Sequence, residues 1–269
     1  MEYRILGKTG LRVSILGFGG IPIRRVTEKE AIAVVNRALD LGVNLIHTSA
    51  GYGDSAYKIG KVMAERRKEC FLTVKVSGRS EAEAREELKR SLTALNTNHI
   101  EIAQLPVNVD AFPEVMGPGG AYKAFQQAQK DGTIDFIGIT SHDANFLTEV
   151  ITGEAFSNLI VPFNYAANTP RVKLLPLAAK LNMGAIAMKT LGKGGLTNPS
   201  QALRYVWNHD VDTAIVGMNR LSEIEQNAAT ANDPKPLTKE EEKQLQKMAD
   251  EIIKANRLSS SGEVSAPYH

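Results

Sequence analysis

Several short apolar runs of the sequence end in, or lead directly into, side chains that can carry out chemistry. The most informative is Lys75, because an ammonium group within the run FLTVKV (71–76) costs several kcal/mol unless it is paired or lines a cavity. A lysine with a depressed pKa can form a Schiff base, and a histidine such as His47 can exchange protons near neutral pH. The polar residues at these positions are His47, Tyr52, Lys75, Thr140, Ser141, Asn164, Tyr165 and Lys189.

Two glycine-containing segments are suited to holding phosphate. LGKGGL (191–196) carries Lys193, and GMNRLSEIEQN (217–227) opens a predicted helix with Arg220 and Ser222 in its first turn. Backbone N–H groups in such loops and at helix N-termini bind anions. Because no segment has the Rossmann fingerprint G-x-G-x-x-G, the sequence favours a phosphate site of the barrel type.

These residues belong to a repeating pattern of strands and helices. Eight β-branched apolar runs alternate with helix-length segments at a spacing of about 30 residues, which predicts a single α/β domain, a (β/α)8 TIM barrel. The runs cover 13–19, 44–49, 71–76, 100–107, 135–140, 158–165, 183–189 and 213–218. Reactive groups of such barrels gather at the carboxyl ends of the strands, so the polar residues that end these runs should meet there.

The ends of the chain lie outside the eight repeats. Residues 3–13 predict an N-terminal β-hairpin, and residues 237–255 predict an extra amphipathic C-terminal helix. We expect one domain over residues 1–257 and a flexible tail, rich in Ser, Gly and Pro, over residues 258–269. Capping-box spacing predicts helix starts at Thr27 with Glu30, Ser80 with Glu83 and Thr238 with Glu241.

Four stretches of the sequence resemble the aldo-keto reductase family. GVNLIHTSAGYGDSAYKIG, followed by FLTVKV, is similar to the family's second strand N-x-I-D-T-A, its Y-G-x-S-E motif and the catalytic lysine that ends its third strand. LGKTGLRVSILGFGG resembles the family's hairpin and first strand, DGTIDFIGITSHD its fifth strand, and ALRYVWNHDVDTAIVGMNRLSEIEQN its cofactor-binding end. The motifs occur in the family's order along nearly the whole chain. The resemblance implies reversible hydride transfer between NADPH and a carbonyl.

The resemblance assigns catalytic roles to Tyr52 and Lys75. Tyr52 would protonate the developing alkoxide, and an ammonium beside a phenol favours the phenolate, which brings a tyrosine pKa from near 10 toward working pH. Two positions depart from the family, because His47 replaces an Asp and Pro106 replaces a His. His47 has no permanent negative charge and would repel Lys75 when protonated, whereas Pro106 has no side-chain donor for a substrate carbonyl.

The resemblance also assigns the cofactor contacts. Thr140 and Ser141 would meet the nicotinamide amide, Met188 would replace the family's aromatic ring beneath it, and Arg220 favours NADPH because a guanidinium matches a 2′-phosphate. Glu223 and Asn227 would approach the ribose and adenine. The complete predicted set is Thr140, Ser141, Met188, Lys189, Leu191, Gly192, Lys193, Gly217, Asn219, Arg220, Ser222, Glu223 and Asn227.

The two departures leave three functions open. The first is an NADPH-dependent oxidoreductase in which His47 takes over part of the missing histidine's role. The second is a nicotinamide-binding barrel without ordinary carbonyl reduction, either a redox-neutral lyase or isomerase or a non-catalytic binding module. The third is Schiff-base chemistry on Lys75 or Lys189.

Composition excludes other classes of protein. The 269 residues contain 32 Lys and Arg against 30 Asp and Glu, and because neither sign forms a long block, we expect no nucleic-acid or membrane partner, only a small-molecule substrate. The one cysteine, Cys70, cannot form an internal disulfide and is expected to be a buried thiol. With no signal-like N-terminus and no apolar run of about 18 residues, the sequence predicts a cytoplasmic protein. No His or Cys spacing suggests a metal, and the oligomeric state is left open.

Overall fold

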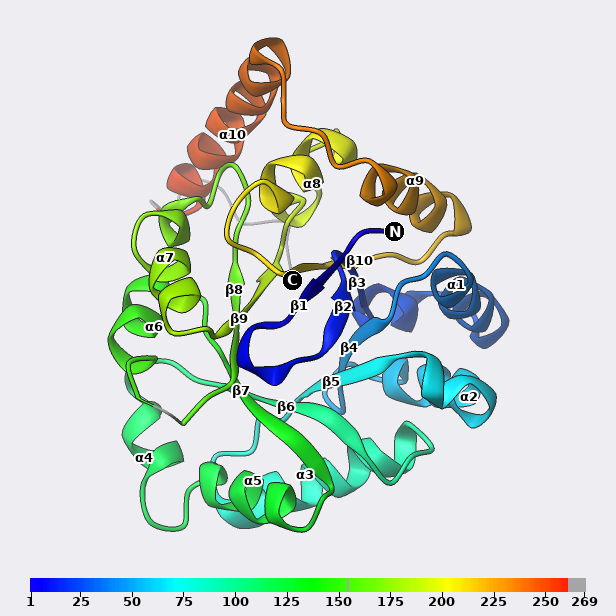
Figure 1. The fold of residues 1–269 in the computed structure, drawn as a ribbon, viewed down its shortest axis with the longest axis vertical. Coiled ribbons are helices and arrows are strands. Elements are labelled where there is room, and N and C mark those ends of the chain that lie inside the picture. Colours follow the sequence, from blue (N-terminus) through cyan, green and yellow to red (C-terminus); the bar gives the residue numbers. More distant parts are fainter. Residues whose placement is uncertain (154, 261–269) are drawn as a thin grey trace.

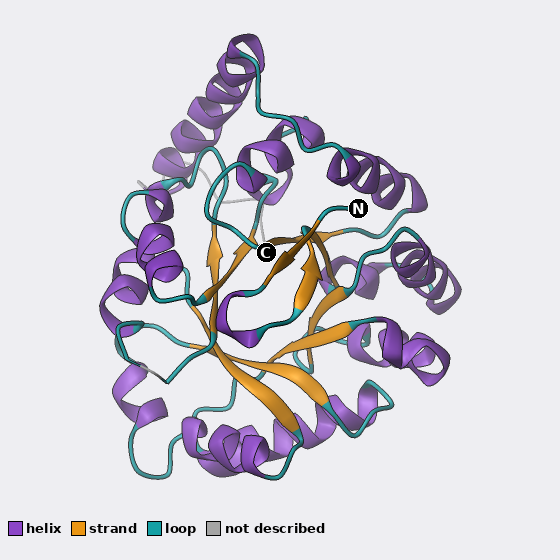
Figure 2. Ribbon diagram, viewed as in Figure 1, coloured by secondary structure: helices purple, strands orange, loops and turns teal. Residues whose placement is uncertain are grey.

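The computed structural model describes residues 1–153 and 155–260, with side chains up to residue 255. Eight parallel strands close into a barrel in the order β10-β3-β4-β5-β6-β7-β8-β9, and helices surround it (Figures 1 and 2). This confirms the predicted (β/α)8 barrel. The barrel strands are β3 (Leu16–Gly19), β4 (Leu45–Ser49), β5 (Phe71–Lys75), β6 (Ile100–Pro106), β7 (Ile134–Thr140), β8 (Asn158–Pro162), β9 (Gly184–Met188) and β10 (Thr213–Gly217).

Helices follow the barrel strands in alternation. The outer helices are α1 (Glu28–Asp40), α2 (Ser55–Arg66), α3 (Glu81–Ala94), α4 (Phe112–Met116), α5 (Ala121–Lys130), α6 (Ala144–Val150), α7 (Leu174–Lys180), α8 (Pro199–Trp207) and α9 (Leu221–Asn232). The predicted capping boxes at Thr27, Ser80 and Thr238 all form, with the side chain and backbone hydrogen bonds made in both directions. Within the described residues no helix has the length and apolarity needed to cross a lipid bilayer.

An N-terminal hairpin closes the barrel at the amino ends of its strands. β1 (Tyr3–Ile5) pairs antiparallel with β2 (Arg12–Ser14), and Figure 1 shows this hairpin over the barrel axis. Leu6 and Val13 are fully buried in an interior apolar cluster with residues of five barrel strands. The hairpin was predicted, but the first predicted barrel strand (13–19) divides, because its first residues belong to β2. Water and ligands therefore approach the barrel from the opposite end, here called the mouth.

A layer of polar side chains fills the middle of the barrel beneath the mouth. The Gln104 amide donates to the Asn158 side-chain oxygen at 2.5 Å and to the Thr73 hydroxyl at 3.3 Å, and all three residues are fully buried. Gly138 makes room for this layer, because a Cβ there would overlap the amides of Gln104 and Asn158. These polar side chains bond to one another in the middle of the barrel, so the barrel interior is filled by side chains.

The extra C-terminal helix lies outside the ring of barrel helices. α10 (Lys239–Ser260) packs on α8, where the Arg204 guanidinium holds Glu241 through two contacts at 2.6 and 2.8 Å. Arg204 also donates to the carbonyls of Lys235 and Pro236, so it fixes the segment that leads into α10. The helix continues to Ser260, so the domain boundary predicted at 257 falls inside it. The predicted tail beyond residue 260 lies outside the described residues.

Cys70 is a buried thiol that immediately precedes β5. Its side chain is 4% exposed, and its sulfur lies 3.5 Å from the sulfur of Met63. Burial raises the pKa of this thiol to about 12, so the reactive thiolate is scarce at neutral pH. The expected structural role of Cys70 fits this environment, whereas the cytoplasmic location stays a prediction.

Candidate active site

Tyr52, Lys75 and His47 meet at the mouth of the barrel. The Lys75 ammonium lies 5.0 Å from the centroid of the Tyr52 ring, and the His47 ring meets the Tyr52 ring edge-on with centroids 5.9 Å apart. Lys75 is the last residue of β5, His47 lies within β4, and Tyr52 follows β4 in its loop. All three are partly buried. A phenol, an ammonium and an imidazole thus lie together at the mouth, and these are groups that can transfer a proton to a substrate oxygen.

The loop that carries Tyr52 is held by its own backbone and by buried side chains. The Tyr52 N–H donates to the Ser49 carbonyl at 3.0 Å, and the next residue, Gly53, has φ +59°, a left-handed conformation that favours glycine. The buried Ser55 hydroxyl donates to the Gly20 carbonyl at 2.7 Å. The Lys58 ammonium donates to the Ile23 and Val26 carbonyls, which ties α2 to the loop after β3. The tyrosine is therefore presented from a fixed turn.

His47 is uncharged at neutral pH in this environment. Burial of the ring, and then repulsion by the Lys75 ammonium, lower the pKa of His47 to about 3. The sequence led us to expect that a protonated His47 would repel Lys75. In the structure the effect falls on the histidine instead: burial and then the charge of Lys75 keep His47 unprotonated, so a neutral imidazole lies beside Tyr52. A neutral imidazole can donate one hydrogen bond to a substrate oxygen.

Pro106 ends β6 at the same level of the mouth. Its Cα pairs in register with Thr140 of β7, whose side chain is 6% exposed. The next N–H, that of Val107, is already donated to the Thr140 carbonyl at 2.9 Å. This corner of the mouth therefore offers a proline ring where the family pattern has an imidazole, so His47 is the imidazole left beside Tyr52.

The loop after β9 turns through several residues with left-handed backbone. Lys189, Gly192, Lys193 and Gly194 have φ values of +55°, +56°, +57° and +95°. The N–H groups of Gly192, Gly194 and Gly195 are donated within the loop, to the carbonyls of Lys189, Leu191 and Gly192. Lys193 itself is exposed at this turn. The segment predicted from its glycines thus forms a tight turn that carries an exposed lysine, a side chain that can pair with phosphate.

The N-terminus of α9 supplies a second group of donors. Arg220 is the N-cap residue, and its guanidinium lies 3.2 Å from a carboxylate oxygen of Glu223. The other oxygen of Glu223 accepts from the N–H groups of Asn219 and Arg220 at 2.9 and 3.2 Å. A 2′-phosphate would compete with Glu223 for Arg220, while a 2′-hydroxyl could donate to Glu223. Arg220 and Ser222 are exposed, and Gly217 is the exposed last residue of β10.

The remaining predicted cofactor residues lie at different depths. Thr140 and Ser141 are buried at the end of β7, and Met188 is partly exposed at the end of β9. Asn227, in the second turn of α9, is only 4% exposed. Its amide donates to the sulfur of Met218 at 3.2 Å, so the side chain is directed toward the barrel and away from solvent. Leu191 and Gly192 are partly buried in the β9 loop.

Asn164 and His142 belong to the same mouth; Asn164 was predicted to lie at the strand ends but was assigned no catalytic or cofactor role, and His142 was not among the predicted site residues. The Asn164 amide donates to the carbonyl of Lys189 at 2.8 Å and thereby holds its left-handed turn. The pKa of His142 is lowered by burial and then by Lys189, Lys75 and Lys193. The sequence predicts no role for His142. Its closeness to Lys75 of β5 and to two lysines of the loop after β9 had no signal in the sequence.

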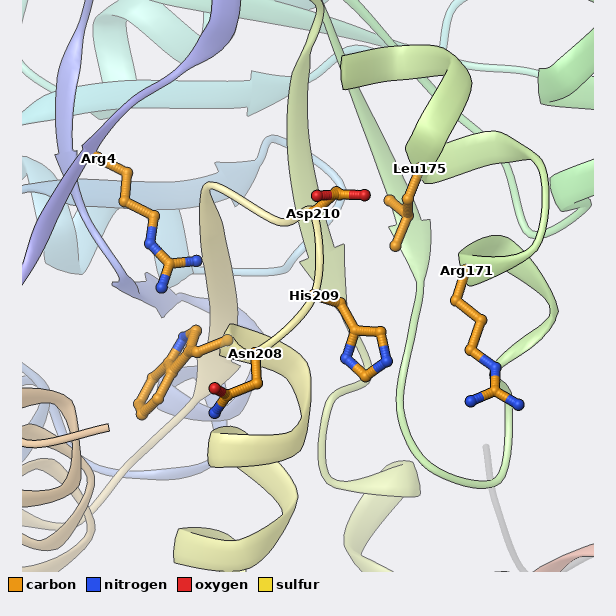
Figure 3. A pocket seen from close by; sticks show the side chains of 7 residues that line it. Arg4, Arg171, Leu175, Asn208, His209 and Asp210 are labelled. Carbon is orange, nitrogen blue, oxygen red and sulfur yellow. The ribbon is translucent and has the colours of Figure 1, made fainter. Parts of the chain in front are cut away.

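Two polar cavities lie outside the mouth. One of about 480 Å³ is lined by Arg4, Arg171, Leu175 and residues 207–210, and Figure 3 shows the His209 ring in its centre. The other, of about 420 Å³, shares Arg171 and His209 and reaches Tyr165 and α10. The catalytic and cofactor residues predicted above line neither cavity. In the described part of the chain, no three His, Cys, Asp or Glu residues are arranged to hold a metal ion.

Comparison with known proteins agrees with this architecture. Residues 15–202 match the model of the Aldo/keto reductase family. The uncharacterized oxidoreductase YqkF of Bacillus subtilis is 27% identical over 214 residues, which span 73% of this chain and 67% of YqkF. L-galactose dehydrogenase of Arabidopsis thaliana is 24% identical over 90% of this chain and 92% of its own length. The holo form of aldo-keto reductase AKR11C1 from Bacillus halodurans superimposes with a TM-score of 0.78 at 24% identity, covering 92% of this chain and 96% of that one.

A closed (β/α)8 barrel with a tyrosine and a lysine at its mouth matches the architecture of the aldo-keto reductases. The chain belongs to the aldo/keto reductase family.

Proposed function

We propose that the protein is an NADPH-dependent oxidoreductase that interconverts a carbonyl compound and its alcohol. The observation that carries this proposal is the Lys75 ammonium 5.0 Å from the Tyr52 ring at the mouth. Family membership and oxidoreductase relatives support the reaction class. The choice of NADPH rests on Arg220, whose guanidinium at the start of α9 suits a 2′-phosphate.

Residues of two loops would hold the cofactor. The left-handed turn at Gly192 and Lys193 and the N-terminus of α9 flank the seventh and eighth barrel strands, where barrels of this kind bind phosphate. Thr140 and Ser141 would hold the nicotinamide amide. When bound, the reduced nicotinamide supplies a hydride to the carbonyl carbon.

The protein's own residues would complete the reduction at the carbonyl oxygen. As the C=O π bond breaks, Tyr52 gives its proton to the oxygen and the alcohol forms; solvent then reprotonates Tyr52. Lys75 stabilises the resulting phenolate by its charge. His47, neutral at working pH, donates a hydrogen bond to the same oxygen and substitutes for the imidazole missing at Pro106. The site thus keeps one imidazole, that of His47 on β4, in place of the one that the family has at the position of Pro106.

Turnover of Tyr52→Phe tests the proposal. NADPH oxidation with generic aldehydes and quinones should fall about 100- to 10,000-fold in Tyr52→Phe, the range attributed to loss of a general acid. Tyr57→Phe is the matched control, because Tyr57 is an exposed tyrosine on α2 whose ring also has a lysine, Lys61, 4.5 Å away. The control should keep wild-type turnover.

Cofactor binding is measured separately by calorimetry with NADPH and NADH. Arg220→Ala should weaken the binding of NADPH about tenfold or more and leave the binding of NADH nearly unchanged, because only NADPH carries the 2′-phosphate. Tight NADPH binding without turnover of any carbonyl would instead support the nicotinamide-binding barrel without carbonyl reduction. Absence of binding to both nucleotides would refute the proposed function.

A further inference from the structure

Helix α10 contacts α8 along most of its length and then continues toward the loop after β9. The ion pair with α8 described above lies at the start of α10. Further along, the Gln201 amide donates to the side-chain oxygen of Gln244 at 2.7 Å, and the Thr197 hydroxyl donates to the sulfur of Met248 at 3.4 Å. The two helices therefore run in opposite directions, and α10 extends beyond the first residue of α8.

Beyond these contacts, Ile252 of α10 packs on the loop after β9 (191–196), here called the β9 loop. A Cβ placed on Gly195 would lie 2.7 Å from Cγ1 and 2.8 Å from Cδ1 of Ile252, and a Cβ on Gly192 would lie 3.1 Å from Cδ1. Non-bonded carbon atoms prefer separations of about 3.5–4.0 Å. Ile252 thus lies directly against the loop backbone and leaves no room for a side chain at Gly195.

The contact with Ile252 explains why residue 195 is a glycine. Gly195 has φ −72°, a right-handed conformation that any residue adopts, whereas Gly192 and Gly194 have positive φ values that favour glycine. Backbone conformation therefore accounts for the first two glycines, and the close approach of Ile252 accounts for the third. The glycine-rich segment is thus in part a contact surface for α10.

The β9 loop is also the segment to which the proposed function assigns the cofactor phosphate. Several of its N–H groups are donated to carbonyls of the same turn at 2.9–3.2 Å. Because these hydrogen bonds are local, they fix the shape of the turn and leave its position to contacts from other elements. Ile252 supplies such a contact from α10, and it thereby helps to set where the exposed Lys193 is presented.

We propose that α10 holds the β9 loop in the position that binds the nucleotide, with Ile252 as the positioning residue. This inference rests on the proposed function. Ile252 acts through the loop backbone: when its side chain is shortened the loop gains freedom, and ordering the loop on binding then costs conformational entropy. The diphosphate is common to NADPH and NADH, so loosening the loop lowers the affinity for both nucleotides.

Calorimetry with NADPH and NADH tests this role in Ile252→Ala. The dissociation constants of both nucleotides should rise about 3- to 30-fold, the range of coupling through packed side chains. Arg220→Ala differs, because it should affect NADPH alone. In turnover assays Ile252→Ala should raise KM for NADPH and, at saturating NADPH, leave KM for the carbonyl compound unchanged.

Two variants control for a general effect on α10. Ile252→Val keeps the Cγ1 atom that lies nearest the Gly195 position, so it should retain most of the affinity for both nucleotides. Lys247→Ala, at an exposed position of α10, should bind both nucleotides as the wild type does. Fluorescence of the buried Trp207 shows whether each variant is folded.

A double-mutant cycle with Gly195→Ala measures the contact itself. Gly195→Ala alone should weaken nucleotide binding, because its methyl group would overlap Ile252. In the Ile252→Ala background that overlap is gone, and the nearest remaining neighbour is the Gly192 carbonyl oxygen at 3.3 Å, so Gly195→Ala should have little further effect. An additive cycle would overturn the inference, because the two residues would then act on the nucleotide independently.

Hydrogen exchange without nucleotide separates this inference from the proposed function. Amides of the β9 loop should exchange faster in Ile252→Ala than in the wild type or Lys247→Ala. If they do, and the wild type binds neither nucleotide, the hold of α10 on the loop stands and only the proposed function fails. Unchanged exchange of the loop, or wild-type nucleotide affinity in Ile252→Ala, would overturn the inference and leave the oxidoreductase proposal intact.

Discussion

Burial of a neutral His47 should make the protein lose stability in mild acid. The unfolded chain binds a proton on this histidine below pH 6.5, whereas the folded protein does so only near pH 3. Between these values the unfolded state holds more protons, so the free energy of unfolding falls as the pH falls. Two pH units, from 6.5 to 4.5, correspond to about 2 to 3 kcal/mol at about 1.36 kcal/mol per unit.

Urea unfolding of wild type and His47→Gln measures this contribution. The fluorescence of the single tryptophan, the buried Trp207, reports the transition. Other groups titrate equally in both proteins, so the change with pH in the difference between their unfolding free energies isolates His47. The wild type should lose about 2 to 3 kcal/mol more than the variant between pH 6.5 and 4.5. Parallel pH profiles would refute the reasoning, because they would mean that folded His47 accepts a proton as readily as the unfolded chain.

Three further predictions concern the scaffold. Asp212 should make the protein more stable as the pH falls, which is opposite to the effect of His47, because burial raises the pKa of Asp212 to about 6. The wild type should gain about 2 to 3 kcal/mol in unfolding free energy from pH 6 to pH 4, and Asp212→Asn should remove this gain in the same unfolding series. Gly138→Ala should lower the unfolding free energy by about 1 to 3 kcal/mol, because its methyl group would overlap the buried amide of Gln104. Arg204→Met should lower the unfolding free energy by about 1 to 3 kcal/mol, because it removes both contacts to Glu241. Limited proteolysis should then cleave α10 faster than in the wild type.

The elements could be predicted because each is encoded by neighbouring residues. The run that ends in Lys75 is apolar and β-branched, and Thr27 with Glu30 satisfies helix N–H groups within one turn, so sequence spacing alone locates both. The division of 13–19 into β2 and β3 was missed because a continuous run of strand-forming residues does not reveal which of its residues leave the barrel. Only packing of Val13 into the barrel interior decides that.

The sequence by itself determined the barrel, the Tyr52 and Lys75 pair, and the substitutions at His47 and Pro106, since these are residue identities at strand ends. The tertiary structure decided how the charges behave. The neutrality of His47 depends on burial beside Lys75, and the lowered pKa of Lys189 depends on burial and on the charges of Lys193 and Lys75, which closure of the barrel brings from β5 and the loop after β9 to the same mouth. Electrostatic energies depend on distance and solvent exposure, and these are set by residues that are distant in the sequence, 28 positions apart for His47 and Lys75 and 114 for Lys75 and Lys189.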